Sequence, residues 1–136
     1  MLSNELRTTV IKAALEARKW AYAPYSNYLV GAAVLTDSGK VYDGVNVENA
    51  AYTDGICAER VAVFKAVSEG ERRFAAVAVA TSNGGTPCGS CRQVLSEFGL
   101  ETLVLIVNDQ GHLMQETTVG DLLPGAFTAD ALPESS

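Results

Sequence analysis

The chain has 136 residues, of which 48% are hydrophobic and 19% charged, and a formal net charge of −6. This length and apolar content fit one globular domain over residues 1–136, with a core of its own, and exclude two domains. Its ten Lys and Arg are scattered among sixteen Asp and Glu, which argues against a nucleic-acid partner, because binding phosphates needs clustered cations.

The sequence predicts a cytoplasmic protein with no membrane partner. Its N-terminus passes straight into an amphipathic pattern, without the apolar core of a signal peptide. The longest apolar runs, such as residues 75–80, have the size of a strand and are too short to span a bilayer. Three cysteines, two of them in a C-x-x-C pattern, favour metal or redox chemistry over a disulfide scaffold.

The first half of the chain is predicted to form a helix and a β-hairpin. Hydrophobic periodicity indicates a helix that Pro24 ends, an apolar strand and a returning strand, over residues 4–22, 29–36 and 41–47. Small residues around Gly31 would let another element approach the first strand closely. In the second strand, Asn46 and Glu48 share a face, since strand side chains alternate. Such a pair could grip the hydroxyls of a sugar, although an ordinary solvated strand end is the commoner case.

The second half alternates helices and strands. The predicted helices cover residues 57–68, 88–98 and 118–123, and the predicted strands cover residues 74–81, 103–107 and 112–116. A hairpin followed by β-α-β crossovers gives an α/β fold, here a three-layer α/β/α sandwich around a mixed five-stranded sheet.

The three cysteines predict a catalytic zinc site. Cys88 and Cys91 meet on one face of a helical turn, and Cys57 begins a different helix. Helix N-termini lower thiol pKa values and favour thiolates. Three protein ligands leave the fourth position of zinc to water, as in catalytic zinc sites. Glu59 is then a candidate proton shuttle, and Arg60 is placed to donate hydrogen bonds to the thiolates and offset their charge.

Three other interpretations of the cysteines compete with this one. His112, the single histidine, could complete a structural zinc site, but it follows a turn and has no ligand-like spacing. A redox pair at Cys88 and Cys91 would leave Cys57 and Glu59 without a role. Three ordinary buried cysteines would not explain their position at two helix starts.

Two motifs carry a resemblance to a known family. Cys57-Ala58-Glu59-Arg60 and Pro87-Cys88-Gly89-Ser90-Cys91 resemble the zinc nucleoside deaminase signature in its all-cysteine form. The chain is similar more specifically to the small homotetrameric cytidine deaminases, through residues 22–26, 30–33, 44–50 and 122–127.

The resemblance implies hydrolytic deamination of cytidine and 2′-deoxycytidine, for pyrimidine salvage, by attack of a zinc-activated hydroxide on C4. It assigns one Zn²⁺ per subunit to Cys57, Cys88 and Cys91 and makes Glu59 the proton shuttle. It further implies that Asn46 and Glu48 bind the ribose 3′-hydroxyl. The remaining substrate-site residues that it implies are Tyr28, Tyr52, the backbone of Ala58 and Cys88, and Phe127 from a neighbouring subunit.

Two positions depart from the family pattern. Tyr28 stands where the family usually has Phe, and Asp54-Gly55 replaces a more apolar pair before the zinc cysteine. Both bear on substrate preference, so a deaminase of a modified cytosine nucleoside or of a blasticidin S-like drug is an alternative. A polynucleotide deaminase is disfavoured by the acidic surface. A remote alternative from another class is a non-enzymatic, zinc-stabilised assembly module.

Overall fold

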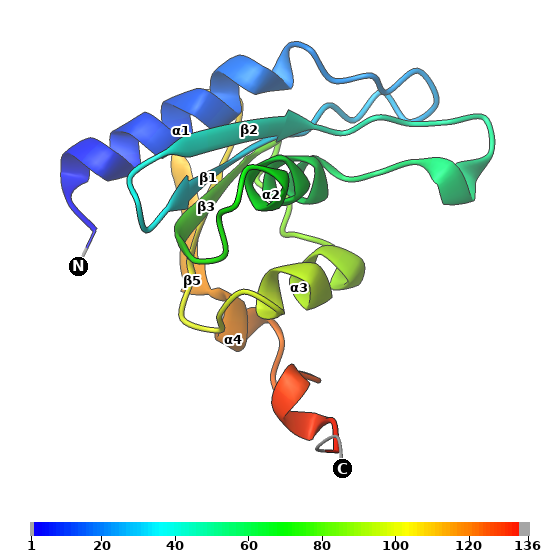
Figure 1. Cartoon of the computed structure of the whole chain (residues 1–136). Helices are drawn as coiled ribbons and strands as arrows, with labels where there is room; N and C mark the ends of the chain where they lie inside the picture. The colour runs from blue at the N-terminus through cyan, green and yellow to red at the C-terminus, as the bar shows by residue number, and fades with distance from the viewer. Residues whose placement is uncertain (1, 134–136) are drawn as a thin grey trace.

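The computed structural model describes residues 2–133 and shows a five-stranded mixed sheet with helices on both faces (Figure 1). The strands lie in the order β2-β1-β3-β4-β5; β3 and β4 pair in parallel and the other neighbours are antiparallel. The strands are β1 Gly31–Thr36, β2 Val41–Val45, β3 Phe74–Ala80, β4 Leu103–Val107 and β5 Leu113–Thr118. The helices are α1 Asn4–Arg18, α2 Ala58–Ser68, α3 Gly89–Ser96 and α4 Val119–Leu122.

Two cores lie on opposite faces of this sheet. Along β3, Ala76 and Ala78 pack in one core with Val10 and Ala14 of α1. The alternate β3 residues, among them Val77, pack in the other core with residues of α2, α3 and α4. Because side chains alternate between the two faces of a strand, β3 packs against helices on both sides of the sheet. The predicted α/β/α arrangement around a mixed sheet is confirmed.

Glycine allows each of two helices to cross a strand closely. A Cβ at Gly31 of β1 would overlap the Ala14 carbonyl oxygen of α1. A Cβ at Gly44 of β2 would lie 2.6 Å from the Ala58 carbonyl oxygen, in the first turn of α2. The predicted close approach at Gly31 is confirmed, and Gly44 seats the helix start that carries the candidate site.

The predicted end of the first helix is wrong. Helix α1 ends at Arg18, well before Pro24. Beyond it the chain turns, and Tyr22 pairs in parallel with Val47 through an isolated bridge. This backbone pairing needs an extended conformation at Tyr22, so tertiary contacts end the helix before proline does.

Other boundaries shift by at most two residues from the prediction. Cys57 and Cys88 lie immediately before α2 and α3, as their N-cap residues, rather than inside the helices. The strand predicted to run to residue 47 ends at Val45. Within residues 2–133, no helix combines the length and the apolar character needed to cross a bilayer.

Candidate active site

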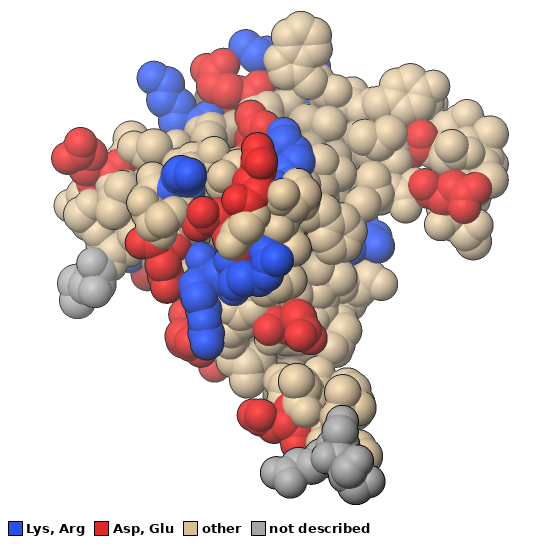
Figure 2. Space-filling view, viewed as in Figure 1, with Lys and Arg blue, Asp and Glu red and all other residues tan. Residues whose placement is uncertain are grey.

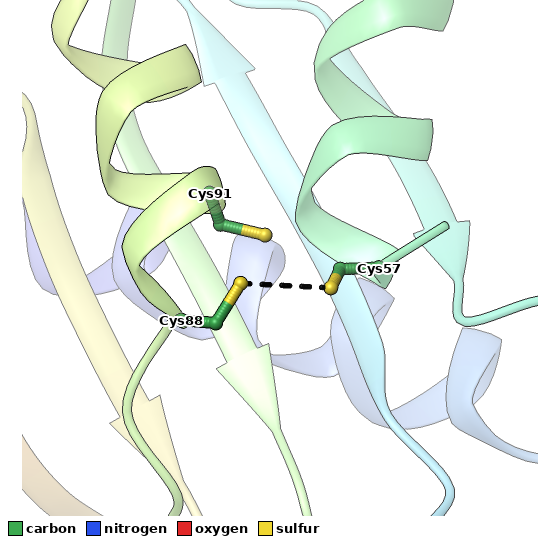
Figure 3. Close-up of side chains that lie close together, drawn as sticks. All are labelled: Cys57, Cys88 and Cys91. Carbon is green, nitrogen blue, oxygen red and sulfur yellow. Dashed lines mark hydrogen bonds between the residues drawn. The ribbon is translucent and has the colours of Figure 1, made fainter. Parts of the chain in front are cut away.

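The sheet topology brings the two cysteine segments to one edge. Strands β2 and β3 are both antiparallel to β1, so they run in the same direction. Each is followed by a helix, α2 after β2 and α3 after β3, and both helices begin near the same edge of the sheet. Cys57 and Cys88, the N-caps of these helices, therefore face each other, with Cys91 in the first turn of α3 (Figure 3).

The cysteine triad has the dimensions of a zinc site. The three Sγ atoms lie within 4.8 Å of one another, and those of Cys57 and Cys88 are 3.8 Å apart. Tetrahedral zinc with bonds of about 2.3 Å to sulfur separates its thiolates by roughly 3.8 Å. Within residues 2–133 the group contains these three ligands and does not include His112. The donor set fits a catalytic zinc, and the structural site completed by His112 is excluded.

The thiols of the triad differ in their proton affinity. Hydrogen bonding from Cys91 and from Arg60, whose guanidinium nitrogen lies 3.4 Å from Sγ, lowers the pKa of Cys57 to about 5. The pKa of Cys91 is raised, because its thiol is hydrogen-bonded to Cys57 and is buried. The lowered pKa of Cys57 and the raised pKa of Cys91 describe one proton that the two sulfurs share. A Cys57 thiolate at neutral pH is ready to bind a metal cation.

Glu59 and Arg60 follow Cys57 in the first turn of α2. The Glu59 side chain is only 4% exposed, and burial raises the pKa of its carboxyl above the usual value. A buried carboxyl with a raised pKa binds a proton more readily than an ordinary one, as suits a residue that transfers protons. The Arg60 guanidinium donates to Cys57 as predicted, while its Nε is buried without a hydrogen-bond partner in the described part of the chain.

A cavity of about 650 Å³ opens beside the triad. Its lining includes Cys57, Cys88, Glu59 and Arg60 on one side. It also includes most of the residues predicted to bind substrate, namely Tyr28, Asn46, Glu48, Tyr52 and Ala58. The volume suits a small organic ligand rather than a polymer. On the face shown in Figure 2, Lys and Arg are interspersed with Asp and Glu and form no continuous basic track.

Asn46 and Glu48 reach this cavity from an extended segment beyond the end of β2. The Asn46 side chain accepts from the Val30 amide (2.9 Å) and donates to the Tyr28 carbonyl (2.8 Å). Glu48 accepts from the Tyr25 amide (3.0 Å) and from the amide and hydroxyl of Ser26. Both side chains thus brace the 25–30 loop, a structural function that strand alternation did not predict.

Phe127 lies outside the cavity lining of its own chain. Its side chain is 60% exposed, and it belongs to the C-terminal segment that projects from the body of the molecule (Figure 1). Gln93 of α3 holds this segment by donating to the Phe127 carbonyl, at 2.8 Å. Tyr52 is more exposed still, at 81%, and packs edge to face against Tyr25.

Arg92 was missed by the sequence interpretation. Its guanidinium donates to the Pro87 carbonyl (2.7 Å), the Thr86 hydroxyl (3.1 Å) and the Leu122 carbonyl (2.8 Å). One side chain thereby fixes the segment before Cys88 and anchors the start of the C-terminal segment. The sequence does contain an indication of this role. A positive charge in the first turn of a helix is unfavourable to the helix dipole, so an Arg there is expected to have specific partners.

The site combines three thiols at two helix starts, a buried carboxyl two residues after Cys57 and a cavity open to a small ligand. This combination is typical of the zinc-dependent deaminases. Comparison with known proteins agrees with this class: residues 4–107 match the family described as "Cytidine and deoxycytidylate deaminase zinc-binding region". The chain belongs to the cytidine deaminase family, and Cys57, Cys88 and Cys91 are the triad of its zinc-binding region.

Individual relatives agree with this assignment. The chain is 51% identical over 127 residues to a cytidine deaminase of Halalkalibacterium halodurans, covering 91% of this chain and 96% of the relative. The crystal structure of a cytidine deaminase from Burkholderia pseudomallei superposes with a TM-score of 0.84 at 48% identity, covering 93% of this chain and 100% of the other. A blasticidin-S deaminase of Bacillus cereus is more distant, at 28% identity over 73% of this chain and 76% of the relative.

Proposed function

We propose that the protein hydrolyses cytidine and 2′-deoxycytidine to uridine and 2′-deoxyuridine, with release of ammonia. The observation that carries this proposal is the buried Glu59 carboxyl beside the thiol triad, at the wall of a cavity open to a small ligand. The membership of the chain in the cytidine deaminase family supports the choice of substrate.

Glu59 moves the protons of the proposed reaction. Cys57, Cys88 and Cys91 would hold the zinc, which would supply an activated water at neutral pH. The Glu59 carboxylate would take one proton from the attacking water and pass it to N3 of the base, as the water oxygen bonds to C4. It then transfers the second proton to the exocyclic amine, the C4–N bond breaks, and ammonia leaves. Burial favours this role, because it raises the pKa of the Glu59 carboxyl, and a carboxylate with a raised pKa accepts a proton more readily.

The other residues hold the nucleoside in place. Backbone groups of Ala58 and Cys88 contact the base edge, and Asn46 and Glu48 bind the ribose 3′-hydroxyl. Hydrogen bonds from Ser26 and Tyr25 lower the pKa of Glu48, so this carboxylate stays ionised and able to accept from a sugar hydroxyl. Tyr28 lines the cavity beside these groups.

The proposed active form is a homotetramer with one Zn²⁺ per subunit. Phe127 is exposed and lies outside its own cavity, which supports a role in stacking on the base bound by a neighbouring subunit. Tyr52, exposed on the loop before α2, is proposed to lie at the same interface. The exposed aromatic side chains would be buried in such an assembly.

The test is an absorbance assay of cytidine deamination with zinc-loaded wild type and Glu59→Ala. Loss of the proton shuttle is expected to lower kcat by about 10²- to 10⁴-fold while the variant remains folded and keeps its zinc. Zinc per subunit and circular dichroism serve as the controls. A non-enzymatic assembly module would instead show no turnover in the wild type and full biological effect in Glu59→Ala.

A second candidate substrate class is a modified cytosine nucleoside or a blasticidin S-like drug. The features that favour it are the Tyr28 hydroxyl and the Asp54-Gly55 pair; Tyr28 and Gly55 line the cavity. Parallel assays with cytidine and blasticidin S discriminate between the two, and a higher kcat/KM for the drug would overturn the choice of cytidine.

A further inference from the structure

Two loops that both contribute to the cavity lining are joined by one side-chain hydrogen bond. Tyr28 belongs to the loop that leads into β1, and Asn83 belongs to the loop that leads from β3 toward Pro87 and Cys88. The Tyr28 hydroxyl donates to the Asn83 side-chain oxygen at 2.6 Å. These residues are 55 positions apart in the chain, so the bond links segments that no local pattern connects. We refer to it as the Tyr28–Asn83 bridge.

The Asn83 end of the bridge is tied to the protein core. Thr81, which is 2% exposed, donates through its hydroxyl to the same Asn83 oxygen at 3.4 Å. The Thr81 hydroxyl also accepts from the backbone amides of Gly84 and Gly85, both at 2.8 Å. Thr81, Gly85 and the adjacent Thr86 line the cavity. The bridge therefore extends a hydrogen-bonded network that shapes the cavity wall just before a zinc ligand.

Gly85 is the position that makes room for the bridge. A Cβ at Gly85 would lie 2.5 Å from the Tyr28 hydroxyl oxygen, which is shorter than any tolerated contact. The next atoms it would meet are the Tyr28 ring carbon Cζ at 3.6 Å and the Asn83 oxygen at 3.8 Å, both ordinary contacts. The backbone at Gly85 has no positive φ that would exclude alanine. The Tyr28 hydroxyl, in the position from which it bonds to Asn83, is therefore the atom that a methyl group at Gly85 would displace.

We propose that Tyr28, Asn83 and Gly85 form a positioning unit that holds the cavity wall in its substrate-binding conformation. Tyr28 acts through its hydroxyl bond to Asn83, and the absence of a side chain at Gly85 admits that hydroxyl. The choice of cytidine as the substrate rests on the proposed function. The hydrogen bond and the close contact that define the unit do not depend on it.

Such a unit affects binding more than chemistry. Without the bridge, the two loops are held less firmly, and a smaller fraction of the free enzyme has the wall in place. The apparent affinity falls by that fraction, whereas the bound enzyme reacts as before. Loss of one such hydrogen bond corresponds to roughly a three- to ten-fold rise in KM. A merely structural role would lower the amount of folded enzyme and would leave KM unchanged.

The experiment is a double-mutant cycle on the zinc-loaded enzyme with Tyr28→Phe, Gly85→Ala and the combination of both. Tyr28→Phe is expected to raise KM for cytidine about three- to ten-fold, with kcat within about two-fold of wild type. Gly85→Ala alone is expected to raise KM further, because the new methyl group displaces the hydroxyl and the ring. The double variant is expected to match Tyr28→Phe, since removing the hydroxyl also removes the clash.

Amide hydrogen exchange supplies a measurement that does not depend on turnover. The Gly84 and Gly85 amides are expected to exchange about three- to ten-fold faster in Tyr28→Phe than in wild type. Tyr22→Phe is the matched control, because it removes a tyrosine hydroxyl outside the cavity and should change neither measurement. If the wild type fails to deaminate cytidine, the exchange data still test the bridge.

Two results would overturn the proposal. The first is an equal rise in KM from Gly85→Ala whether it is introduced into the wild type or into Tyr28→Phe, which would show that the two positions act independently. The second is wild-type KM and wild-type exchange at Gly84 and Gly85 in Tyr28→Phe. Either result would show that the hydroxyl does not hold the wall.

Discussion

Arg60 and Glu48 are two charged residues that line the cavity and whose side chains are held by hydrogen bonds. Arg60 points at a metal ligand and leaves its Nε buried without a partner within residues 2–133. Glu48 takes three hydrogen bonds from the 25–26 segment while facing the cavity. Each charged side chain lies where it could contact substrate or a metal ligand, and each also forms hydrogen bonds that order nearby residues.

Replacing Arg60 with Ala is expected to weaken zinc retention and kcat/KM by about 10- to 100-fold, the usual effect of losing a hydrogen-bond partner of a metal ligand. With Cys91, the guanidinium lowers the pKa of Cys57, and its loss deprives this thiolate of a charged hydrogen-bond donor. Zinc transfer to a chromogenic chelator measures retention. Arg73→Ala, on the loop before β3, is the matched control. Unchanged zinc content and activity in Arg60→Ala would contradict the role assigned to it.

Replacing Ser26 with Ala is expected to raise the pKa of Glu48, because the Ser26 side-chain bond is the largest cause of its lowered value. A lowered pKa in the folded state stabilises the protein above the unfolded value and loses that effect as pH falls through the folded value. The stability difference between wild type and Ser26→Ala should therefore be present at neutral pH and shrink under acidic conditions. Carboxyl-carbon NMR titration of Glu48 measures the pKa, and a value equal in both proteins would refute the prediction.

Helix α3 links the zinc segment to the C-terminal segment. Its first turn carries Cys91, and the next two residues, Arg92 and Gln93, hold backbone groups on either side of it. Glu59 and Arg60 lie in the first turn of α2 and Cys57 is its N-cap, and the close contact at Gly44 holds this turn against β2. Each of these side chains therefore depends on how a helix start is fixed to the sheet.

Replacing Arg92 with Ala is expected to loosen two segments at once, because three hydrogen bonds to Thr86, Pro87 and Leu122 are lost. Hydrogen exchange should accelerate at residues 84–88 and 122–127, and zinc should be released faster. Arg92→Lys should restore only part of this protection, since one ammonium group cannot replace the guanidinium fork. Acceleration confined to one of the two segments would show that Arg92 does not join them.

Across the whole molecule, large aromatic side chains are exposed after α1, before α2 and in the C-terminal segment. Trp20 is 76% exposed, Tyr52 81% and Phe127 60%. Exposed apolar groups of this size are costly on an isolated subunit and are typical of surfaces that associate. The proposed homotetramer would bury them and complete each cavity with a neighbour's Phe127.

The assembly prediction is tested by mixing subunits. Phe127→Ala is expected to raise KM by about ten-fold or more through loss of an aromatic stacking contact, while sedimentation still gives a tetramer. Mixed tetramers of Phe127→Ala and Glu59→Ala should then regain sites with wild-type KM, because one subunit supplies Glu59 and its neighbour supplies Phe127. A monomeric wild type, or no recovery on mixing, would contradict the shared site.

Much of the fold followed from local patterns. Strand alternation and helical periodicity predicted both helical layers and the mixed sheet, and the spacing of Cys57, Cys88 and Cys91 predicted the metal triad. The helices, the strands and the Cys88–Cys91 pair depend on residues close in the chain, whose side-chain directions follow from backbone geometry, whereas Cys57 lies 31 positions before Cys88. Helix ends were less predictable, because the bridge between Tyr22 and Val47 stops α1 before Pro24 does.

The sequence by itself determined the chemistry of this protein: three thiols and one carboxyl at two helix starts, a family signature and the order of its elements. Only the tertiary structure decided which distant groups hold that chemistry in place. The bonds of Arg92 to Leu122 and of Tyr28 to Asn83 join segments 30 and 55 positions apart. Such partners are chosen by how the strands and helices pack, so no pattern along the chain specifies them, and the cavity wall emerges only when the sheet has formed.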